Sequence, residues 1–271
     1  MQYALAQHKR YSLKFEPFEQ TAVGGAYLKF GCGCGCGYFE TGESYRTIYH
    51  HSSFINHQLA MSFNLSATLN IIRLVFKPEL CLPHLAVPNF NQIPIPVSSD
   101  LIPKDKIKAI VLDKDNCIAK DHDDKVWHEY TEHWEELKKM YPNANQLLIV
   151  SNSAGTNDDK QHQQAKLIEK RTGVTILRHS TKKPGCHVEI MDFFREKGIC
   201  KSPSEVVIVG DRLFTDVLMA NMMGSYGIWL NPGVHKSDSI VCRLERYVYS
   251  LLLSRNYQPP IPGASVTVTS H

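Results

Sequence analysis

The chain has 271 residues, of which 43% are hydrophobic and 21% are charged, and this is the composition of a soluble globular protein. Its formal net charge of +3 is too small to argue for nucleic-acid binding. No run approaches the roughly 18 consecutive apolar residues that a membrane-spanning helix needs, so any membrane contact is expected to be peripheral or through an anchor.

Residues 1–60 differ in character from the rest of the chain because they keep no period of 2 or 3.6. The Gly-Cys alternation at 31–37 lacks a Cys-x-x-Cys spacing and is interpreted as low complexity rather than as a metal clip. We expect 1–60 to be a disordered leader or a mis-assigned extension, with Met61 as a natural start of the folded protein. No secretory signal opens the chain, so its eight cysteines are predicted to be reduced and intracellular.

Residues 61–105 form the second region. Apolar residues recur there at helical spacing, namely Leu69, Ile72, Val75 and Phe76. Five prolines follow between positions 78 and 96 and predict an extended, turn-rich arm. The apolar stripe fits either packing against the core or contact with a bilayer.

From residue 106 the pattern becomes regular, and apolar runs alternate with segments of helical period. The runs predict strands at 109–112, 147–150, 174–177, 206–209 and 226–230, and the segments between them predict helices at 129–140, 158–171, 184–197 and 213–223. Unbroken apolar strands alternating with helices predict an α/β fold, a Rossmann-like parallel sheet with helices on both faces.

A C-terminal helix completes the predicted domain, which spans 106–255, and 256–271 are expected to be a flexible tail. The helix carries an apolar stripe with three arginines beside it, namely Ile240, Leu244, Tyr247, Leu251 and Leu252 with Arg243, Arg246 and Arg255. As in the first stripe, core packing and a peripheral bilayer contact both fit the pattern.

Polar residues follow four of the predicted strands, where ligands bind in parallel sheets. They are Asp113 and Asp115, then Ser151 and Asn152, then Lys182 and Lys183, and finally Asp211 with Asp216.

These residue types suit phosphoryl transfer, because a carboxylate nucleophile that faces a phosphate needs Mg²⁺ and a lysine to cancel the repulsion. Asp115 lies two residues beyond Asp113, so in extended chain both side chains point the same way and Asp115 can serve as acid and base. The hydroxyl of Ser151, with the backbone N–H groups after it, can hold phosphoryl oxygens, although Ser151 also fits a helix cap. Either Lys182 or Lys183 can supply the charge, and Lys183 is favoured because it directly precedes Pro184.

The same residues carry a family resemblance. The segments "LDKDNC", "SNSAG", "HSTKKPGC" and "VGDRLFTDVLMANMMGSYG" match, in order, the four motifs of the haloacid dehalogenase-like (HAD) superfamily, and they closely resemble the mitochondrial phosphatidylglycerophosphate phosphatases within it. The resemblance covers residues 61–255. One departure is Cys117, where the wider superfamily usually has threonine.

The resemblance implies roles for individual residues. Asp113 is the expected nucleophile, Asp115 the acid and base, and Lys183 the charge-cancelling lysine. Ser151, Asn152 and Lys182 are expected to contact phosphate. The expected Mg²⁺ ligands are Asp113, Asp115, Asp211 and Asp216.

The spacing of the motifs leaves no room for a cap domain, since only short segments follow Asp115 and Ser151. An open site suits a bulky substrate such as a lipid head group. The resemblance therefore implies hydrolysis of phosphatidylglycerophosphate to phosphatidylglycerol, for cardiolipin synthesis on the matrix side of the inner mitochondrial membrane. Two alternatives stay open, namely a phosphatase of nucleotides, sugar phosphates or phosphoproteins, and a non-catalytic membrane scaffold. The intact pair Asp113 and Asp115 argues against the scaffold.

Overall fold

The computed structural model describes residues 28–30, 37–39 and 73–263. The chain divides into two units, residues 1–61 and residues 62–271. In the first unit, strand β1 (Leu28–Phe30) pairs antiparallel with β2 (Gly37–Phe39). Most of the expected leader, all but one residue of the Gly-Cys run, and residues 264–271 of the expected tail lie outside the described residues.

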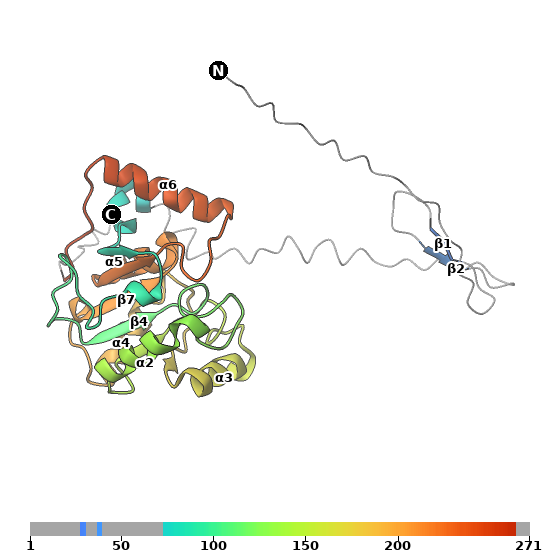
Figure 1. The fold of residues 1–271 in the computed structure, drawn as a ribbon, viewed down its shortest axis with the longest axis horizontal. Helices are drawn as coiled ribbons and strands as arrows, with labels where there is room; N and C mark the ends of the chain where they lie inside the picture. Colours follow the sequence, from blue (N-terminus) through green and yellow to red (C-terminus); the bar gives the residue numbers. More distant parts are fainter. Residues whose placement is uncertain (1–27, 31–36, 40–72, 264–271) are drawn as a thin grey trace, which may run out of the picture. The chain divides into compact units, whose positions relative to one another are not determined.

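The second unit contains a sheet of six parallel strands in the order β3-β8-β7-β4-β5-β6. The neighbouring strands β7 and β4 are labelled in Figure 1. Their bounds are Leu85–Val87 for β3, Ala109–Leu112 for β4, Leu147–Ile149 for β5, Thr175–Ile176 for β6, Val206–Gly210 for β7 and Tyr226–Leu230 for β8. The α-helices are α2 (Thr131–Met140), α3 (Gln163–Thr172), α4 (His187–Glu196), α5 (Leu218–Met223) and α6 (Ile240–Ser254). Short 3₁₀ helices lie at Pro78–Cys81, Phe90–Gln92, His128–Tyr130, Lys160–His162 and Pro203–Glu205, and a π-helix lies at Leu213–Val217.

Helices cover both faces of the sheet, and alternate residues of β4 show how. Ile110 and Leu112 share a buried cluster with residues of α2 and α3, whereas Ala109 and Val111 share another with residues of α4 and α5. A strand buried on both faces has no polar side to present, which explains its unbroken apolar sequence. The predicted α/β, Rossmann-like parallel sheet is thereby confirmed.

Helix α4 is shorter than the helix predicted at 184–197, and the helix predicted at 213–223 is a π-helix followed by α5. Two further differences from the sequence prediction concern β3 and the start of α3. Strand β3 comes from the proline-rich tract and adds to the sheet beside β8. It was not predicted, because a segment of three partly exposed residues is too short to show a strand pattern. Helix α3 begins at Gln163 rather than at 158, because Gln161 and His162 have positive φ values of 55° and 53°. The carboxylate of Asp159 accepts hydrogen bonds from the backbone N–H groups of Gln164 and Ala165 and so caps this start.

Helix α6 packs on the body through one side only. Leu252 is buried against Trp229 of β8 and Phe214, whereas Ile240, Leu244 and Tyr247 are 83%, 50% and 65% exposed. The apolar stripe of α6 is therefore divided between the core and the surface.

The helical residues 73–76 show the same division. Leu74 packs against the cluster that α6 joins, while Val75 and Phe76 are exposed. Leu69 and Ile72 lie outside the described residues. Within the part of the chain that the structure describes, no helix has both the length and the apolar character to cross a bilayer.

Candidate active site

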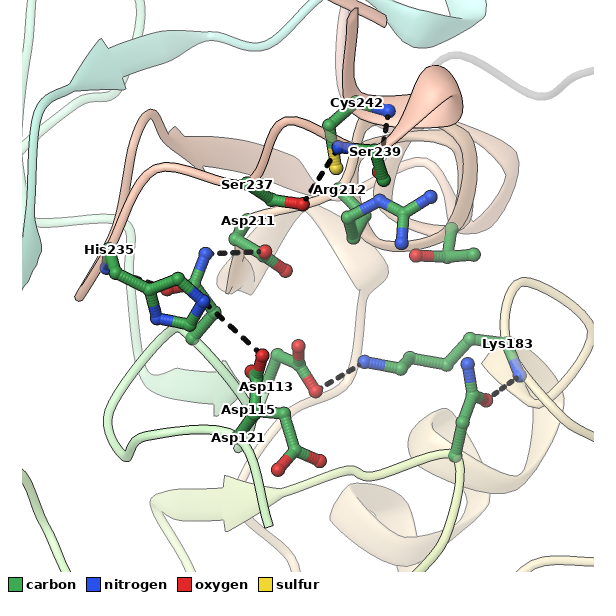
Figure 2. Close-up of a pocket in the computed structure, with 13 residues that line it drawn as sticks. Asp113, Asp115, Asp121, Lys183, Asp211, Arg212, His235, Ser237, Ser239 and Cys242 are labelled. Atoms are coloured by element: carbon green, nitrogen blue, oxygen red, sulfur yellow. Dashed lines mark hydrogen bonds and ion pairs between the residues drawn. The ribbon is translucent and has the colours of Figure 1, made fainter. Parts of the chain in front are cut away.

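A cavity of about 370 Å³ opens at the carboxyl ends of the central strands (Figure 2). Five residues expected from the sequence line it, namely Asp113, Asp115, Asn152, Lys183 and Asp211. Eight more line it from the loops after β4, β7 and β8 and from the start of α6, namely Asn116, Asp121, Arg212, Thr215, His235, Ser237, Ser239 and Cys242.

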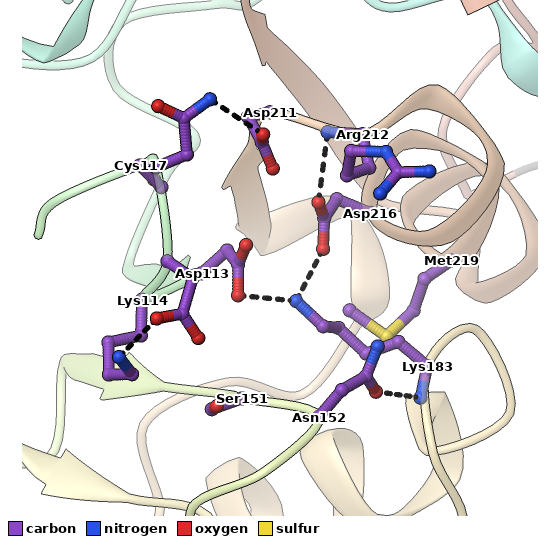
Figure 3. A network of polar contacts seen from close by, with 12 residues as sticks. Asp113, Lys114, Cys117, Ser151, Asn152, Lys183, Asp211, Arg212, Asp216 and Met219 are labelled. Atoms are coloured by element: carbon purple, nitrogen blue, oxygen red, sulfur yellow. Dashed lines mark hydrogen bonds and ion pairs between the residues drawn. The ribbon is translucent and has the colours of Figure 1, made fainter. Parts of the chain in front are cut away.

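The centre of the site is a buried lysine between two carboxylates (Figure 3). Asp113 directly follows β4, and its backbone N–H donates to the carbonyl of Val209 in β7. The Nζ atom of Lys183 lies 2.6 Å from Oδ1 of Asp113 and 2.6 Å from Oδ1 of Asp216. Three residues that are far apart in sequence thus meet at the ammonium group of Lys183.

Burial dominates the electrostatics of this centre. It raises the pKa of Asp113 from 3.8 to about 7, with Lys183 opposing the rise and Asp216 adding to it. Burial alone would lower the pKa of Lys183, but Asp113 and Asp216 raise it above its ordinary value, so the ammonium stays charged. Burial and the charges of Asp113 and Asp216 raise the pKa of Asp211 well above its ordinary value. One lysine therefore does not balance the negative charge of the site.

This excess of negative charge fits a cation. One carboxylate oxygen from each of Asp113, Asp211 and Asp216 lies within 4.8 Å of the others. Carboxylate oxygens are the ligands that Mg²⁺ prefers, usually one or two of them with water and phosphate oxygens. The donor set therefore fits Mg²⁺, which these three residues would hold. The fourth expected ligand, Asp115, is not a member of this cluster.

Asp115 lines the cavity from the turn after β4. Its Oδ1 accepts a hydrogen bond from Nζ of the buried Lys114 and another, of 2.9 Å, from the backbone N–H of His122. Nζ of Lys114 also donates to the carbonyl of Asp123. One oxygen of Asp115 is thereby fixed on the protein side of the cavity wall.

Ser151 and Asn152 follow β5 and act on the loops around them. The Ser151 hydroxyl is buried and accepts hydrogen bonds from the backbone N–H groups of Ser153 and Ala154 at 3.2 and 3.3 Å. These bonds close a turn and do not cap a helix, because residues 152–159 form turns and bends and α3 begins only at Gln163. It does not line the cavity among the described residues. The Oδ1 atom of Asn152 accepts a 2.9 Å hydrogen bond from the backbone N–H of Lys183, so Asn152 holds the lysine loop.

The two neighbouring lysines take different places. Lys183 is buried between Asp113 and Asp216, whereas Nζ of Lys182 lies 2.8 Å from Oδ2 of the exposed Asp158 and outside the cavity lining. The favoured residue of the pair is thus the one that contacts the expected nucleophile. Cys117, the departure from the superfamily pattern, is buried and does not line the cavity among the described residues.

Asn116 was not identified as a site residue from the sequence. Its Nδ2 donates to Oδ2 of Asp211 at 2.9 Å and to the carbonyl of Pro232 at 3.0 Å, and its Oδ1 accepts from the backbone N–H of His235. Its φ of 56° lies in the left-handed region that asparagine tolerates best among residues with a side chain. The sequence signal that could have identified it is its position directly after Asp115, the expected acid and base. Asn116 joins the loop after β4 to Asp211 and to the loop after β8.

The parallel α/β fold and its buried carboxylate–lysine site are compatible with an enzyme that hydrolyses phosphate esters, and similarity to known proteins establishes this class. A family model described as mitochondrial PGP phosphatase matches residues 65–235. The chain belongs to this family.

Curated relatives agree with this assignment. The mitochondrial phosphatidylglycerophosphatase GEP4 of Saccharomyces cerevisiae is 55% identical over 189 residues, which is 70% of this chain and 98% of that protein. A probable mitochondrial phosphatidylglycerophosphatase of Schizosaccharomyces pombe is 31% identical over 74% of this chain and 98% of its own length. A chloroplastic/mitochondrial phosphatidylglycerophosphate phosphatase of Arabidopsis thaliana is 28% identical over 73% of this chain and 54% of that protein.

Proposed function

We propose that this protein is a Mg²⁺-dependent phosphatase of the HAD type that removes the terminal phosphate of phosphatidylglycerophosphate through a phospho-Asp113 intermediate. The observation that carries the chemistry is the cluster of Asp113, Asp211 and Asp216, in which Asp113 and Asp216 contact the buried ammonium of Lys183. The names of the relatives support the substrate and a mitochondrial location, and the inner-membrane matrix side is proposed with them.

Each residue has a separate task in the proposed reaction. A carboxylate oxygen of Asp113 attacks the phosphorus atom, and the bond between phosphorus and the ester oxygen breaks. Asp115 donates its proton to the departing alkoxide, and then accepts a proton from the water that attacks phospho-Asp113. Cleavage of the acyl phosphate by this water releases inorganic phosphate and restores the Asp113 carboxylate. Mg²⁺, when bound, supplies positive charge against the phosphate oxygens.

The ammonium of Lys183 keeps Asp113 reactive. Burial raises the pKa of Asp113, whereas Lys183 lowers it, so the lysine favours the ionised carboxylate that can attack. The contact of Lys183 with Asp216 holds the ammonium in place when Asp113 becomes an acyl phosphate and its carboxylate charge is lost.

The decisive experiment compares phosphate release from phosphatidylglycerophosphate in mixed micelles with release from a soluble aryl phosphate, each with Mg²⁺ and with EDTA. We expect Mg²⁺-dependent turnover of both and a higher kcat/KM for the lipid. Turnover of soluble esters without turnover of the lipid would refute the substrate, and Asp113→Asn turning over as fast as wild type would refute the mechanism.

A peripheral contact of α6 with the bilayer accompanies this proposal. Its outward side carries exposed Ile240, Leu244 and Tyr247 beside arginines, and its first turn lines the cavity through Cys242. Such a face suits the surface of a membrane containing anionic lipid. We expect wild type to sediment with vesicles that contain phosphatidylglycerol, and Leu244→Ser to do so less.

The control for this contact is Val188→Ser on α4, where a valine is 55% exposed. It is expected to sediment with vesicles like wild type. Equal sedimentation of Leu244→Ser, Val188→Ser and wild type would contradict a contact through α6.

A further inference from the structure

Arg212 lies in the cavity but has no task in the reaction described above. It follows Asp211 directly after β7, and its side chain lines the same cavity as Asp113 (Figure 2). A third of this side chain is exposed. An arginine with access to a phosphatase cavity is a candidate to bind an anion.

Arg212 is held in place by a residue from a distant element. Glu245 of α6 is buried, and its Oε2 accepts a 3.0 Å hydrogen bond from Nε of Arg212 while its Oε1 accepts a 3.0 Å hydrogen bond from the backbone N–H of Phe214. The carboxylate thus binds one edge of the guanidinium. Among the described residues, no hydrogen bond is made by Nη1 or Nη2 of Arg212. These two nitrogens can donate to a ligand.

The distribution of charge separates Arg212 from the reaction centre. Among the described residues that line the cavity, the permanently charged cations are Lys183 and Arg212. Lys183 contacts Asp113 and Asp216 at 2.6 Å, so its charge is directed at the nucleophile. Arg212 contacts Glu245 and leaves its Nη edge for a different anion.

The proposed substrate carries such an anion. Phosphatidylglycerophosphate has a terminal phosphate monoester and, on the other side of a glycerol, a phosphodiester that is not hydrolysed. A cavity of about 370 Å³ lies in the range of roughly 300–1,000 Å³ that holds small ligands. Two phosphates joined by glycerol fit this scale.

We propose that Arg212, positioned by Glu245, forms a second anion subsite that binds the phosphodiester of the substrate while the terminal phosphate lies at Asp113. This inference rests on the proposed function and adds a determinant of specificity to it. The enzyme then selects phosphate monoesters that carry a second phosphate across a three-carbon linker. Thr215, Ser237 and Ser239 line the same cavity and offer hydroxyl donors around this subsite.

A purely structural role of the Arg212–Glu245 ion pair makes a different prediction. It would support the loop that carries Asp216, so its loss would slow every substrate to the same extent. A subsite for the second phosphate affects substrates according to whether they possess that phosphate. The ratio of two substrates therefore separates the two roles.

The test compares dihexanoyl phosphatidylglycerophosphate, dispersed as monomers, with an aryl phosphate that has one phosphate. For Arg212→Gln we expect kcat/KM on the lipid to fall roughly 10- to 150-fold more than on the aryl phosphate, because this is the usual effect of losing hydrogen bonds to a charged group. The loss is expected in KM more than in kcat. Arg212→Lys, which keeps the charge without the fork geometry, is expected to recover part of the lipid selectivity.

Two further variants complete the design. Glu245→Gln removes the carboxylate but leaves the arginine, and is expected to lower lipid selectivity by a smaller factor. Arg195→Gln, at an exposed arginine of α4 paired with Asp192, is the matched control and is expected to behave as wild type.

The outcomes separate this inference from the proposed function. Equal losses of Arg212→Gln on both substrates would overturn the subsite, with the proposed function intact. Failure of the wild-type enzyme to hydrolyse the lipid would overturn the proposed function itself.

Discussion

Replacing Asp113, the proposed nucleophile, by asparagine is expected to stabilise the metal-free protein while it abolishes activity. The side chain is buried, and burial raises the pKa of its carboxyl from 3.8 to about 7. The folded state therefore binds the proton of Asp113 more tightly than the unfolded state does. Asparagine keeps the shape of the neutral acid, and Lys183 keeps its 2.6 Å contact with Asp216.

The size of the effect follows from linkage. A carboxyl whose pKa is raised on folding contributes a free energy of unfolding that falls as pH rises from the unfolded to the folded pKa, here from about 4 to about 7. Three pKa units at about 1.4 kcal/mol each give at most about 4 kcal/mol at pH 8. The advantage of Asp113→Asn over wild type is thus expected to grow from below about 1 kcal/mol at pH 4 towards that limit.

Urea unfolding in EDTA at pH 4, 6 and 8 measures this difference. Asp192→Asn, at an exposed aspartate of α4, is the control and is expected to follow wild type. Added Mg²⁺ is expected to stabilise wild type more than Asp113→Asn, because ligands that bind only the folded state stabilise it by mass action. A metal-free Asp113→Asn variant that is no more stable than wild type at pH 8, or whose advantage does not grow with pH, would refute the electrostatic reasoning.

Three further predictions concern single residues. Asp115→Asn is expected to lower kcat/KM, which reports formation of phospho-Asp113, on alkyl phosphates roughly 10²- to 10⁴-fold, and far less on dinitrophenyl phosphate, whose leaving group needs no proton; equal losses of kcat/KM for the two substrates would argue against its role as acid. Lys183→Met is expected to lose most aryl phosphatase activity while Lys182→Met stays within a few-fold of wild type, since only Lys183 contacts Asp113; the reverse ranking of kcat/KM would contradict the assignment. Gly233 has a φ of 82°, and a Cβ added there would lie 2.3 Å from the carbonyl oxygen of Asn116, whereas a Cβ added at Gly198 would meet nothing within 4 Å. Gly233→Ala is therefore expected to lower the free energy of unfolding by at least about 1 kcal/mol more than Gly198→Ala. Similar melting temperatures of the two variants would contradict this prediction.

The sheet could be predicted from the sequence because its strands are buried on both faces. Runs such as 109–112 and 206–209 have no polar residue to interrupt them, and each is followed directly by an acidic residue or by glycine and an acidic residue. Strand β3 could not be predicted in this way. It has only three residues, none of them fully buried, and it lies in a tract rich in proline. Its place beside β8 depends on tertiary packing.

Site residues could be predicted where a polar residue comes directly after a predicted strand. They were harder to predict where contacts join distant segments. Asp113 and Asp211 follow strands whose ends lie side by side. The choice between Lys182 and Lys183 depends on which way each side chain leaves a loop, which spacing does not encode. The pairing of Arg212 with Glu245 joins residues that are 33 positions apart in different elements, so no local pattern indicates it.

The most direct test of the account is covalent trapping of the phosphorylated enzyme. Wild-type protein would be mixed with phosphatidylglycerophosphate and Mg²⁺, quenched in acid within one turnover, digested, and analysed by mass spectrometry. The account predicts an acid-stable, hydroxylamine-sensitive phosphoryl group on the peptide that contains Asp113, and none in Asp113→Asn or without Mg²⁺. A phosphoryl group on another residue, or turnover of the lipid by Asp113→Asn at the wild-type rate, would contradict it.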